Sequence, residues 1–331
     1  MKAIALSTPV TWSGITETRR LRYGEKILSL GSCFSERIGS WLFQRGFDTV
    51  VNPFGTLYNP ISIAQALESL AEGQGAFDPN MLFEHQGKYH SFMHHSRYSR
   101  ATQEEALKCI EEDLQRGREQ LLQGRWLLLT LGSSFLYTHK ELQSVVANCH
   151  KLPEHHFTHT KGDKSLFVAR LQPIIATLLE RNRELEILLT VSPIRYLRYG
   201  AAASQRSKAE LLLTAEALED LFKGRVHYFP AYEIMMDELR DYRYYAEDMI
   251  HPTELAVEVI RQRLLNGWLS ASEQEPLQVA EKLFQRTQHR PIHASEEEQR
   301  TMQQILEQEG KRIRHKFPNL VLRNILPTLE E

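Results

Sequence analysis

The sequence has little of what marks secreted, membrane-spanning or nucleic-acid-binding proteins. Its three cysteines are too few and too scattered for a disulfide framework, and an odd number fits a reducing compartment. No stretch approaches the roughly 20 apolar residues that cross a bilayer, and the first residues lack the apolar core of a secretory signal. A formal net charge of -2 gives no electrostatic reason for a nucleic-acid or membrane partner. We therefore expect a cytoplasmic protein whose partner is a small molecule or an uncharged polymer.

The chain does have the pattern of a globular α/β protein. Its 331 residues are 42% hydrophobic and 25% charged, enough for a substantial core. Segments with helical spacing alternate with short apolar runs, and this order predicts a parallel sheet covered on both faces. The expected strands are Ile27–Leu30, Asp48–Val51, Trp126–Leu131, Glu186–Val191 and Val226–Phe229. We predict a three-layer α/β/α domain with a five-stranded parallel sheet.

Helical patterns set the expected limits of that domain. The helix after the first strand has an apolar stripe formed by Phe34, Ile38, Trp41 and Leu42, and Gly46 is a natural stop. The last helix is expected to begin at Pro252 and to run to about Leu269. We predict a domain of residues 1–269 and a helical, charged extension of residues 270–331. The apolar positions expected to pack the extension on the domain or on a partner are Met302, Ile305, Leu306 and Ile313.

Residues that directly follow strands are the first candidates for chemistry, because ligands of open parallel sheets bind at the carboxyl ends of the strands. The first strand ends in Gly31-Ser32-Cys33 at the start of a helix. The N-terminus of a helix lowers the pKa of a thiol and can bind an oxyanion. The structural alternative is that Ser32 is only a helix cap and Cys33 only a small core residue.

A second candidate lies near the end of the predicted domain, where Asp248 precedes His251 by three residues. Pro252 disfavours helical geometry at His251, so we expect that residue in an extended turn. A carboxylate so close can hold an imidazole in the tautomer that accepts the proton of a nucleophile. The alternative is a capped helix start with a surface histidine.

Several motifs occur in order along the chain: GSCFSERIG, NPFGTLYNP, TLGSSFLY, NCHK, VSPIRYLRYG and YFPAYEIMMDELRDYRYYAEDMIHP. From about Lys26 to Leu269 the sequence resembles the bacterial GSCFA family, which is more distantly similar to the SGNH, or GDSL-type, esterases. The resemblance implies a flavodoxin-like sheet and a hydrolase or acyltransferase acting on an ester or thioester. The substrate class that we expect is an acylated carbohydrate or lipid.

The resemblance also implies roles for individual residues. Cys33 occupies the place of the SGNH serine nucleophile, with Ser32 as the other candidate, and the closing Asp-x-x-His falls on Asp248 and His251. The groups that would surround the oxyanion or the substrate are Asn52, Gly55, Gly132 and Ser134. Ser134 stands where SGNH enzymes have asparagine and has a shorter reach. A cysteine nucleophile forms a thioester, which would favour acyl transfer over simple hydrolysis.

The histidines suggest a competing hypothesis. Nine of the fourteen lie between His85 and His159, and together with Cys149 they could build a zinc site, yet none shows the paired spacing of a common zinc motif. We expect no metal and no cofactor, and assign candidate substrate-binding roles to Asn148, His150, His94 and His95. Two alternatives stay open beside the Cys/Ser-His-Asp enzyme: a metal-dependent hydrolase and a non-catalytic ligand-binding protein. The pattern does not determine the oligomeric state.

Overall fold

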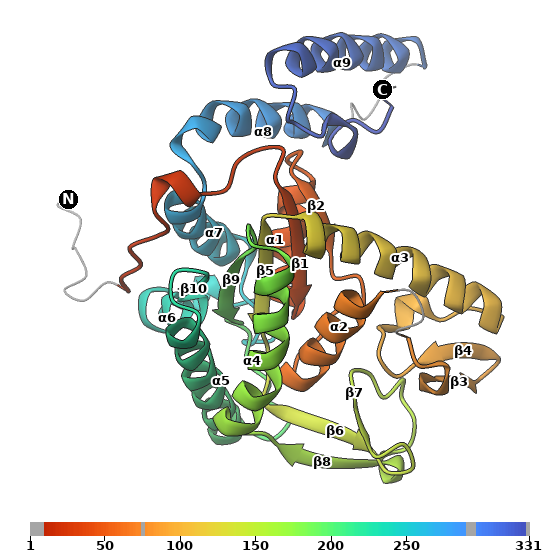
Figure 1. Cartoon of the computed structure of the whole chain (residues 1–331). Helices are drawn as coiled ribbons and strands as arrows, with labels where there is room; N and C mark the ends of the chain where they lie inside the picture. The colour runs from red at the N-terminus through yellow and green to blue at the C-terminus, as the bar shows by residue number, and fades with distance from the viewer. Residues whose placement is uncertain (1–9, 74–76, 289–295, 329–331) are drawn as a thin grey trace.

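The computed structural model describes residues 10–73, 77–288 and 296–328 (Figure 1). Its main sheet has five parallel strands in the spatial order β10-β9-β5-β1-β2. The strands are β1 (Lys26–Gly31), β2 (Asp48–Val51), β5 (Trp126–Leu131), β9 (Glu186–Val191) and β10 (Val226–Phe229). All five predicted strands are present with the expected bounds, except that β1 is longer by one residue at each end.

The order of these strands decides where a ligand can bind. Numbered along the chain, the strands lie in the order 2-1-3-4-5, which is the flavodoxin-like arrangement. The chain places β2 on one side of β1 and β5 on the other, so the connections after β1 and β5 leave in opposite directions. The crevice at such a switch point is where open α/β sheets bind ligands. The loops after β1 and β5 carry Cys33 and Gly132.

Helices cover both faces of the sheet, so the expected three-layer fold is confirmed. Ile27 and Leu128 point into one core, which includes the predicted apolar stripe of α1. Leu28 and Leu129, the next residues along the same strands, point into a second core on the other face. The helices of the first face are α1 (Cys33–Phe43) and α7 (Glu254–Trp268). Those of the second face are α2 (Pro60–Glu72), α3 (Gln103–Gln123), α4 (Lys164–Arg181) and α5 (Ala201–Leu221).

The start of α7 differs from the prediction by two residues. Thr253 is the N-cap, and its hydroxyl accepts a hydrogen bond from the N–H of Ala256 at 3.4 Å. A threonine in this position satisfies a backbone N–H that has no partner within the helix, so the helix begins after it, at Glu254. Pro252 instead pairs with Tyr245 in an isolated β-bridge. It therefore belongs to the turn that presents His251 and not to the helix.

Two small antiparallel sheets were not predicted. β3 (Leu82–His85) and β4 (Lys88–Ser91) form a hairpin whose turn residues, Gln86 and Gly87, both have positive φ. The other sheet consists of β6 (Phe135–His139), β7 (Ser144–Val146) and β8 (Phe157–Lys161). Figure 1 shows both beside α2, away from α7. These strands are short and carry many polar, partly exposed residues, so they lack the continuous apolar runs that revealed the main sheet.

After α7 the chain forms two more helices, α8 (Gln274–Gln288) and α9 (Glu296–Lys316). The short helix α6 (Ala231–Glu233) comes earlier in the chain, directly after β10. Leu306 and Ile313 are buried in the same core as α1 and α7. Met302 and Ile305 are not, being 37% and 46% exposed, so two of the four predicted packing positions do not pack within this chain. Figure 1 explains why: α9 lies apart from the sheet, with only part of its surface toward the rest of the chain.

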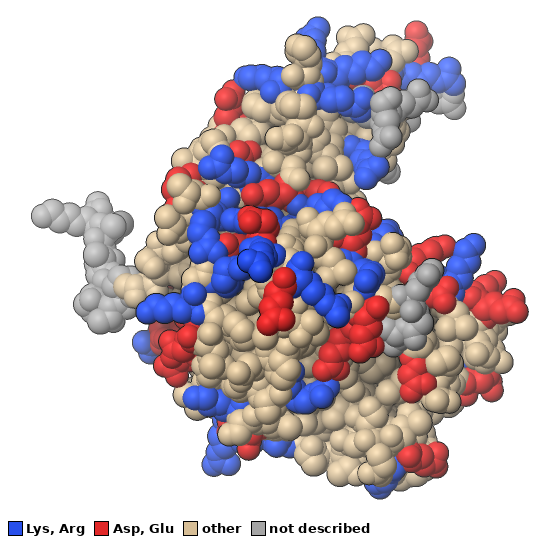
Figure 2. Space-filling view, in the orientation of Figure 1, with Lys and Arg blue, Asp and Glu red and all other residues tan. Residues whose placement is uncertain are grey.

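The surface has no dominant charge on the face shown in Figure 2, where Lys and Arg are interspersed with Asp and Glu over both the domain and the C-terminal helices. This agrees with the small net charge of the sequence. In the described part of the chain, no helix is both long enough and apolar enough to span a membrane.

Candidate functional site

The turn between β1 and α1 presents a thiol at the start of a helix. Gly31 has φ +133°, and a Cβ at this position would lie 2.3 Å from the carbonyl oxygen of Thr130, so only glycine fits. Ser32 is buried, and its hydroxyl caps α1 by accepting a hydrogen bond from the N–H of Phe34 at 3.3 Å. Cys33 is half-buried and is the first residue of the helix. The Ser32 hydroxyl is therefore occupied as a helix cap, whereas the Cys33 side chain lines a cavity.

The turn before α7 holds the second pair of predicted residues together. Oδ2 of Asp248 lies 2.5 Å from Nδ1 of His251. Oδ1 of Asp248 accepts the backbone N–H groups of Ile250 and His251, each at 2.9 Å. Met249, between them, has φ +59°, an uncommon conformation that lets the turn close so tightly. Because the Nδ1 position faces a carboxylate, it carries the proton, and Nε2 is left as the basic nitrogen.

The same contacts keep Asp248 ionised. The pKa of its carboxyl is lowered to about 2, first by the N–H of His251, then by the His251 ring and the N–H of Ile250. Both side chains are about half exposed, at 46% for Asp248 and 49% for His251. The pair therefore places an ionised carboxylate against Nδ1 of the His251 ring.

A cavity of about 830 Å³ brings these two turns together, since both Cys33 and His251 line it. It lies at the carboxyl ends of β1, β5 and β9, where the strand order predicts a ligand. Arg37 of α1 and Glu254 of α7 form an ion pair at 2.8 Å outside the cavity. This pair joins the helix that begins at Cys33 to the helix that follows His251.

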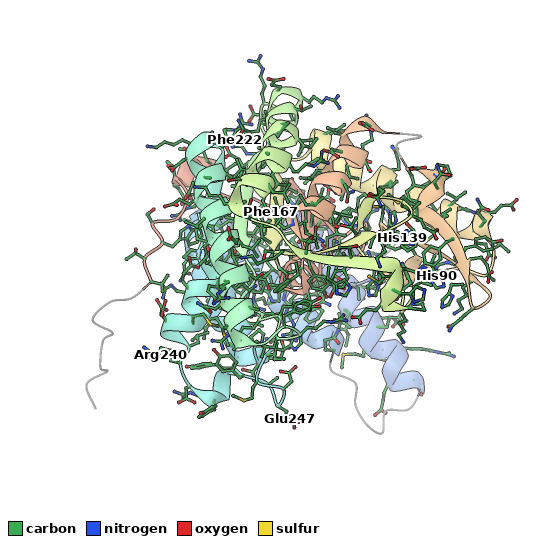
Figure 3. The ribbon with its side chains drawn as sticks, turned by 90° about the horizontal axis from the view of Figure 1, so that it is seen from below. His90, His139, Phe167, Phe222, Arg240 and Glu247 are labelled. Atoms are coloured by element: carbon green, nitrogen blue, oxygen red, sulfur yellow. The ribbon has the colours of Figure 1, made fainter. Side chains whose placement is uncertain are left out.

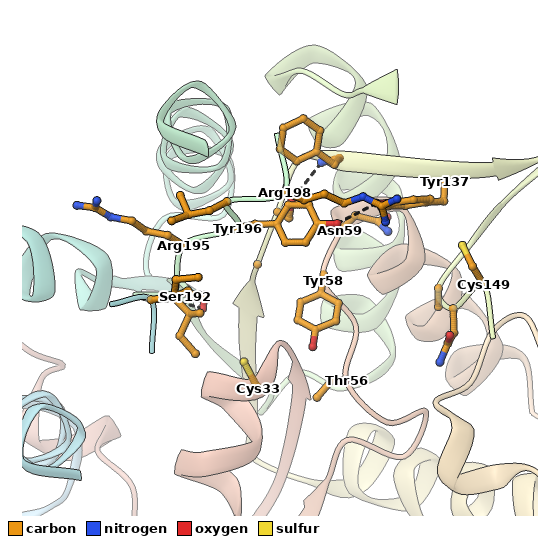
Figure 4. A pocket seen from close by; sticks show the side chains of 18 of the residues that line it. Cys33, Thr56, Tyr58, Asn59, Tyr137, Cys149, Ser192, Arg195, Tyr196 and Arg198 are labelled. Carbon is orange, nitrogen blue, oxygen red and sulfur yellow. Dashed lines mark hydrogen bonds between the residues drawn. The ribbon is translucent and has the colours of Figure 1, made fainter. Parts of the chain in front are cut away.

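The remaining wall of the cavity is rich in tyrosine. In Figure 4, Tyr58 lies beside Cys33, and Tyr137, Tyr196 and Arg198 lie across the opposite side. The hydroxyls of Tyr137 and Tyr196 are 2.8 Å apart, and Nη1 of Arg198 donates to the Tyr137 oxygen at 3.2 Å. Burial and the neighbouring tyrosine hydroxyls raise the pKa of Tyr137, which keeps this network protonated. None of the described residues that line the cavity is Asp or Glu.

Most groups that were expected around an oxyanion have other partners. The N–H of Gly55 donates to the carbonyl of Asn52 at 2.7 Å, and the N–H of Gly132 donates to Tyr58 O at 2.8 Å. Ser134 is fully buried, and its N–H donates to Oγ of Ser207 at 2.8 Å. Of the four candidates, which are Asn52, Gly55, Gly132 and Ser134, only Gly132 lines the cavity. The backbone N–H groups of Gly55, Gly132 and Ser134 hold loops, so these donors are not free for a reacting oxygen.

Asn52 has a structural task in the same region. It is fully buried with φ +44°, and its Oδ1 accepts the N–H of Gly31 at 3.0 Å and the hydroxyl of Ser35 at 3.3 Å. It thereby fixes the turn that presents Cys33. The N–H of Cys33 donates to no other residue in the described part of the chain, so at the start of α1 it is available to an anion, including the Cys33 sulfur itself.

The four candidates from the histidine-rich segments separate into two groups. His95 and Asn148 line the cavity. His94 is fully buried, stacked on Phe54 with ring centroids 4.8 Å apart, and bonded to Oγ of Ser91 at 2.8 Å. His150 is also buried, and its Nε2 donates to Ser91 O at 2.7 Å.

Burial lowers the pKa of His94 to about 3 and that of His150 to about 4. These two rings are therefore neutral packing elements of the small sheets and not residues of the cavity wall. Figure 3 shows His90 and His139 in the same region, well apart from Glu247, the neighbour of Asp248. Within the described residues, no three His, Cys, Asp or Glu side chains are grouped to hold a metal ion.

Sequence patterns did not reveal Lys208, which lies in the charged-looking segment QRSKAELLL. It is 1% exposed, and its Nζ donates to Gly132 O at 2.7 Å and to Ser192 O at 2.8 Å. The helical spacing of its neighbours could have predicted that Lys208 is buried. Ser204, Leu211 and Ala215 fall at the spacing that puts Lys208 on the inner face of α5, and all three are buried.

The comparisons with known proteins complete the description of the site. No curated protein matches the chain. The model of the GSCFA family matches residues 26–264, from the first residue of β1 into α7, and this range includes every residue that lines the cavity. Because the match covers most of the chain, the protein belongs to the GSCFA family.

Proposed function

We propose that this protein is a hydrolase or acyltransferase in which Cys33 attacks the carbonyl carbon of an ester or thioester. The observation that supports this best is that Cys33 and His251 line one cavity while Asp248 holds the His251 ring. The location of the cavity at the switch point of a flavodoxin-like sheet gives further support. It also supports the resemblance to SGNH esterases.

In the proposed reaction, Nε2 of His251 takes the proton of the Cys33 thiol while the Nδ1 proton remains on the hydrogen bond to Asp248. The sulfur forms a bond to the carbonyl carbon, and the electron pair of the C=O bond moves to the oxygen. The free N–H of Cys33 and the positive end of α1 stabilise that oxyanion.

The oxyanion then collapses, the bond to the leaving group breaks, and His251 returns its proton to the leaving oxygen or sulfur. The acyl group remains on Cys33 as a thioester. Water, or an acceptor hydroxyl or thiol, releases it by attack on the thioester carbon, giving its own proton to His251. Cys33 leaves as the thiolate and takes the proton back.

The walls of the cavity support an acylated carbohydrate or lipid as the substrate. Its volume of about 830 Å³ is in the range of small-molecule sites, and aromatic rings such as Tyr58, Phe135 and Tyr196 offer flat apolar faces. The absence of Asp and Glu from the described lining removes repulsion of anionic groups. The metal-dependent alternative has less support, because the described residues offer no grouped metal ligands.

The test uses p-nitrophenyl acetate as the acyl donor, with intact-protein mass spectrometry and peptide mapping to locate the acetyl group. We expect acetylation at Cys33 in the wild type and a strongly reduced rate in His251→Asn. Cys149→Ala is the matched control, because Cys149 lines the same cavity on another wall (Figure 4). A Cys33 that stays unmodified would favour the ligand-binding alternative, and hydrolysis at the wild-type rate by Cys33→Ala would exclude the thiol from the mechanism.

A further inference from the structure

Lys208 is a buried cation at the base of the proposed site. Its ammonium group reaches from α5 to the carbonyls of Gly132 and Ser192, at 2.7 and 2.8 Å. These carbonyls follow β5 and β9, and both residues line the cavity with Cys33. Removing an ammonium group from water costs several kcal/mol, so the surrounding groups have to supply compensating negative charge.

The neighbours of Lys208 supply this charge only in part. In the described part of the chain, no Asp or Glu forms an ion pair with Lys208. The two carbonyl dipoles and the ring of Tyr232, whose centroid lies 5.6 Å from Nζ, carry partial charges only. The titratable group that does act on Lys208 is the thiol of Cys33.

The influence between the two groups is mutual. Burial lowers the pKa of Lys208 to about 7, and negative charge on Cys33 raises it. Burial raises the pKa of the Cys33 thiol, whereas its own backbone N–H, then Lys208 and then Arg37 lower it, and Glu36 of α1 raises it slightly. Negative charge at the sulfur therefore completes the environment of the ammonium group.

We propose that Lys208 is a positioning residue that acts through Cys33: its buried charge stabilises negative charge at the sulfur, while His251 serves the site as the base. The proposal rests on the proposed role of Cys33. Lys208 also donates to carbonyls that follow two strands, so it holds these two parts of the cavity wall in a fixed relation. The site would then be a Cys-His-Asp arrangement with a buried cation that SGNH-type motifs do not predict.

The experiment measures the rate of alkylation of Cys33 by iodoacetamide as a function of pH, with peptide mapping to separate Cys33 from Cys149 and Cys109. The variant Lys208→Gln keeps N–H donors for the two carbonyls but removes the charge. We expect it to raise the apparent pKa of Cys33 by about 1 unit or more, because removing a neighbouring opposite charge shifts a pKa by about 1–3 units. Reactivity at neutral pH would fall about tenfold or more, and the profile of Cys149 would not change.

Ser207→Ala is the matched control, because Ser207 is the neighbouring buried residue of α5 and its hydroxyl accepts the N–H of Ser134. The Ser207→Ala substitution disturbs the same contact between α5 and the loop after β5 without changing charge. We therefore expect the pH dependence of Cys33 alkylation to stay as in the wild type. A folded Lys208→Gln protein with an unchanged Cys33 profile would overturn the proposal, and so would an equal shift in Ser207→Ala.

If Lys208→Gln does not fold, Lys208→Met offers a neutral side chain of similar length, and the wild type offers a test of its own. Burial raises the pKa of Cys149 to about 11, with only Arg198 opposing it. The proposal requires Cys33 to titrate below Cys149, and the reverse order would contradict it. Alkylation needs no substrate, so its outcome is independent of the Cys33→Ala turnover that tests the proposed function.

Discussion

Asp248 and His251 are linked twice: Oδ2 of the carboxylate meets Nδ1 of the ring at 2.5 Å, and Oδ1 accepts the backbone N–H of His251 at 2.9 Å. One carboxylate thus sets both the position of the histidine backbone and the tautomer of its ring. The arrangement is complete within a few residues of sequence and depends on no other element. His251 lines the same cavity as Cys33 because α7 and α1 pack on the same face of the sheet.

Replacing Asp248 by asparagine should separate these two roles. The amide has one acceptor oxygen, so it can retain the backbone N–H groups but presents an NH₂ to Nδ1, which selects the tautomer whose Nε2 carries the proton. We expect acylation of Cys33 to slow by about 100-fold to 10,000-fold. The measurement is the rate of acetyl transfer from p-nitrophenyl acetate.

Glu247→Gln, at the neighbouring exposed position, removes a charge of the same sign and should leave that rate within about twofold. A wild-type rate in Asp248→Asn would show that the carboxylate does not orient the base. Since the pKa of Asp248 is about 2, its ionisation is constant at mildly acid pH and does not shape the pH–rate profile there.

Stability should fall in mild acid because of His94 and His150. Burial lowers their pKa values from 6.5 to about 3 and about 4, so the unfolded chain binds protons that the folded chain does not. The folded protein is therefore fully stabilised by these neutral rings only above the pKa that a histidine has in the unfolded chain. This stabilisation declines as the pH drops below that value. Each histidine should reduce the free energy of unfolding by about 1.4 kcal/mol per pH unit until its folded pKa is reached.

Urea unfolding of wild type and His94→Gln at pH about 7 and about 5 checks this expectation. The variant is expected to be less stable at both values, but its loss between them should be smaller by about 2 kcal/mol. His155→Gln, which changes an exposed histidine of the other histidine-rich segment, should keep the wild-type difference. An unchanged difference in His94→Gln would mean that this ring does not titrate between the two conditions.

The turn that presents Cys33 should be intolerant of any side chain at Gly31. A Cβ there would collide with the carbonyl of Thr130 at 2.3 Å in addition to the strain of φ +133°. We expect Gly31→Ala to lower the free energy of unfolding by more than about 2 kcal/mol. Gly87→Ala is the control, since φ is +71° there but nothing lies within 4 Å of the added atom. Its cost should be about 1 kcal/mol. If urea denaturation gave equal losses of stability for Gly31→Ala and Gly87→Ala, the contact with Thr130 would be unimportant.

The sequence alone determined the main sheet and the two turns that carry Cys33 and His251. The central strands β1, β5 and β9 are buried on both faces, so their apolar runs are continuous and local, and the runs from Trp126 and Glu186 were predicted with their observed bounds. Ser32 and Asp248 act on backbone groups two or three residues away. Such contacts depend on neighbours in the chain, and a sequence pattern therefore reveals them.

Only the tertiary structure decided which groups meet in the cavity. Whether the N–H of Gly55 is free or engaged, and whether Lys208 faces water or the carbonyls of Gly132 and Ser192, depends on loops and helices that are distant in sequence. The histidines divide for the same reason, since packing against Phe54 and Ser91 buries His94 while His95, its neighbour, lines the cavity. The physical cause is that burial and long-range hydrogen bonding belong to the packed chain, whereas caps and strand periodicity belong to the local one.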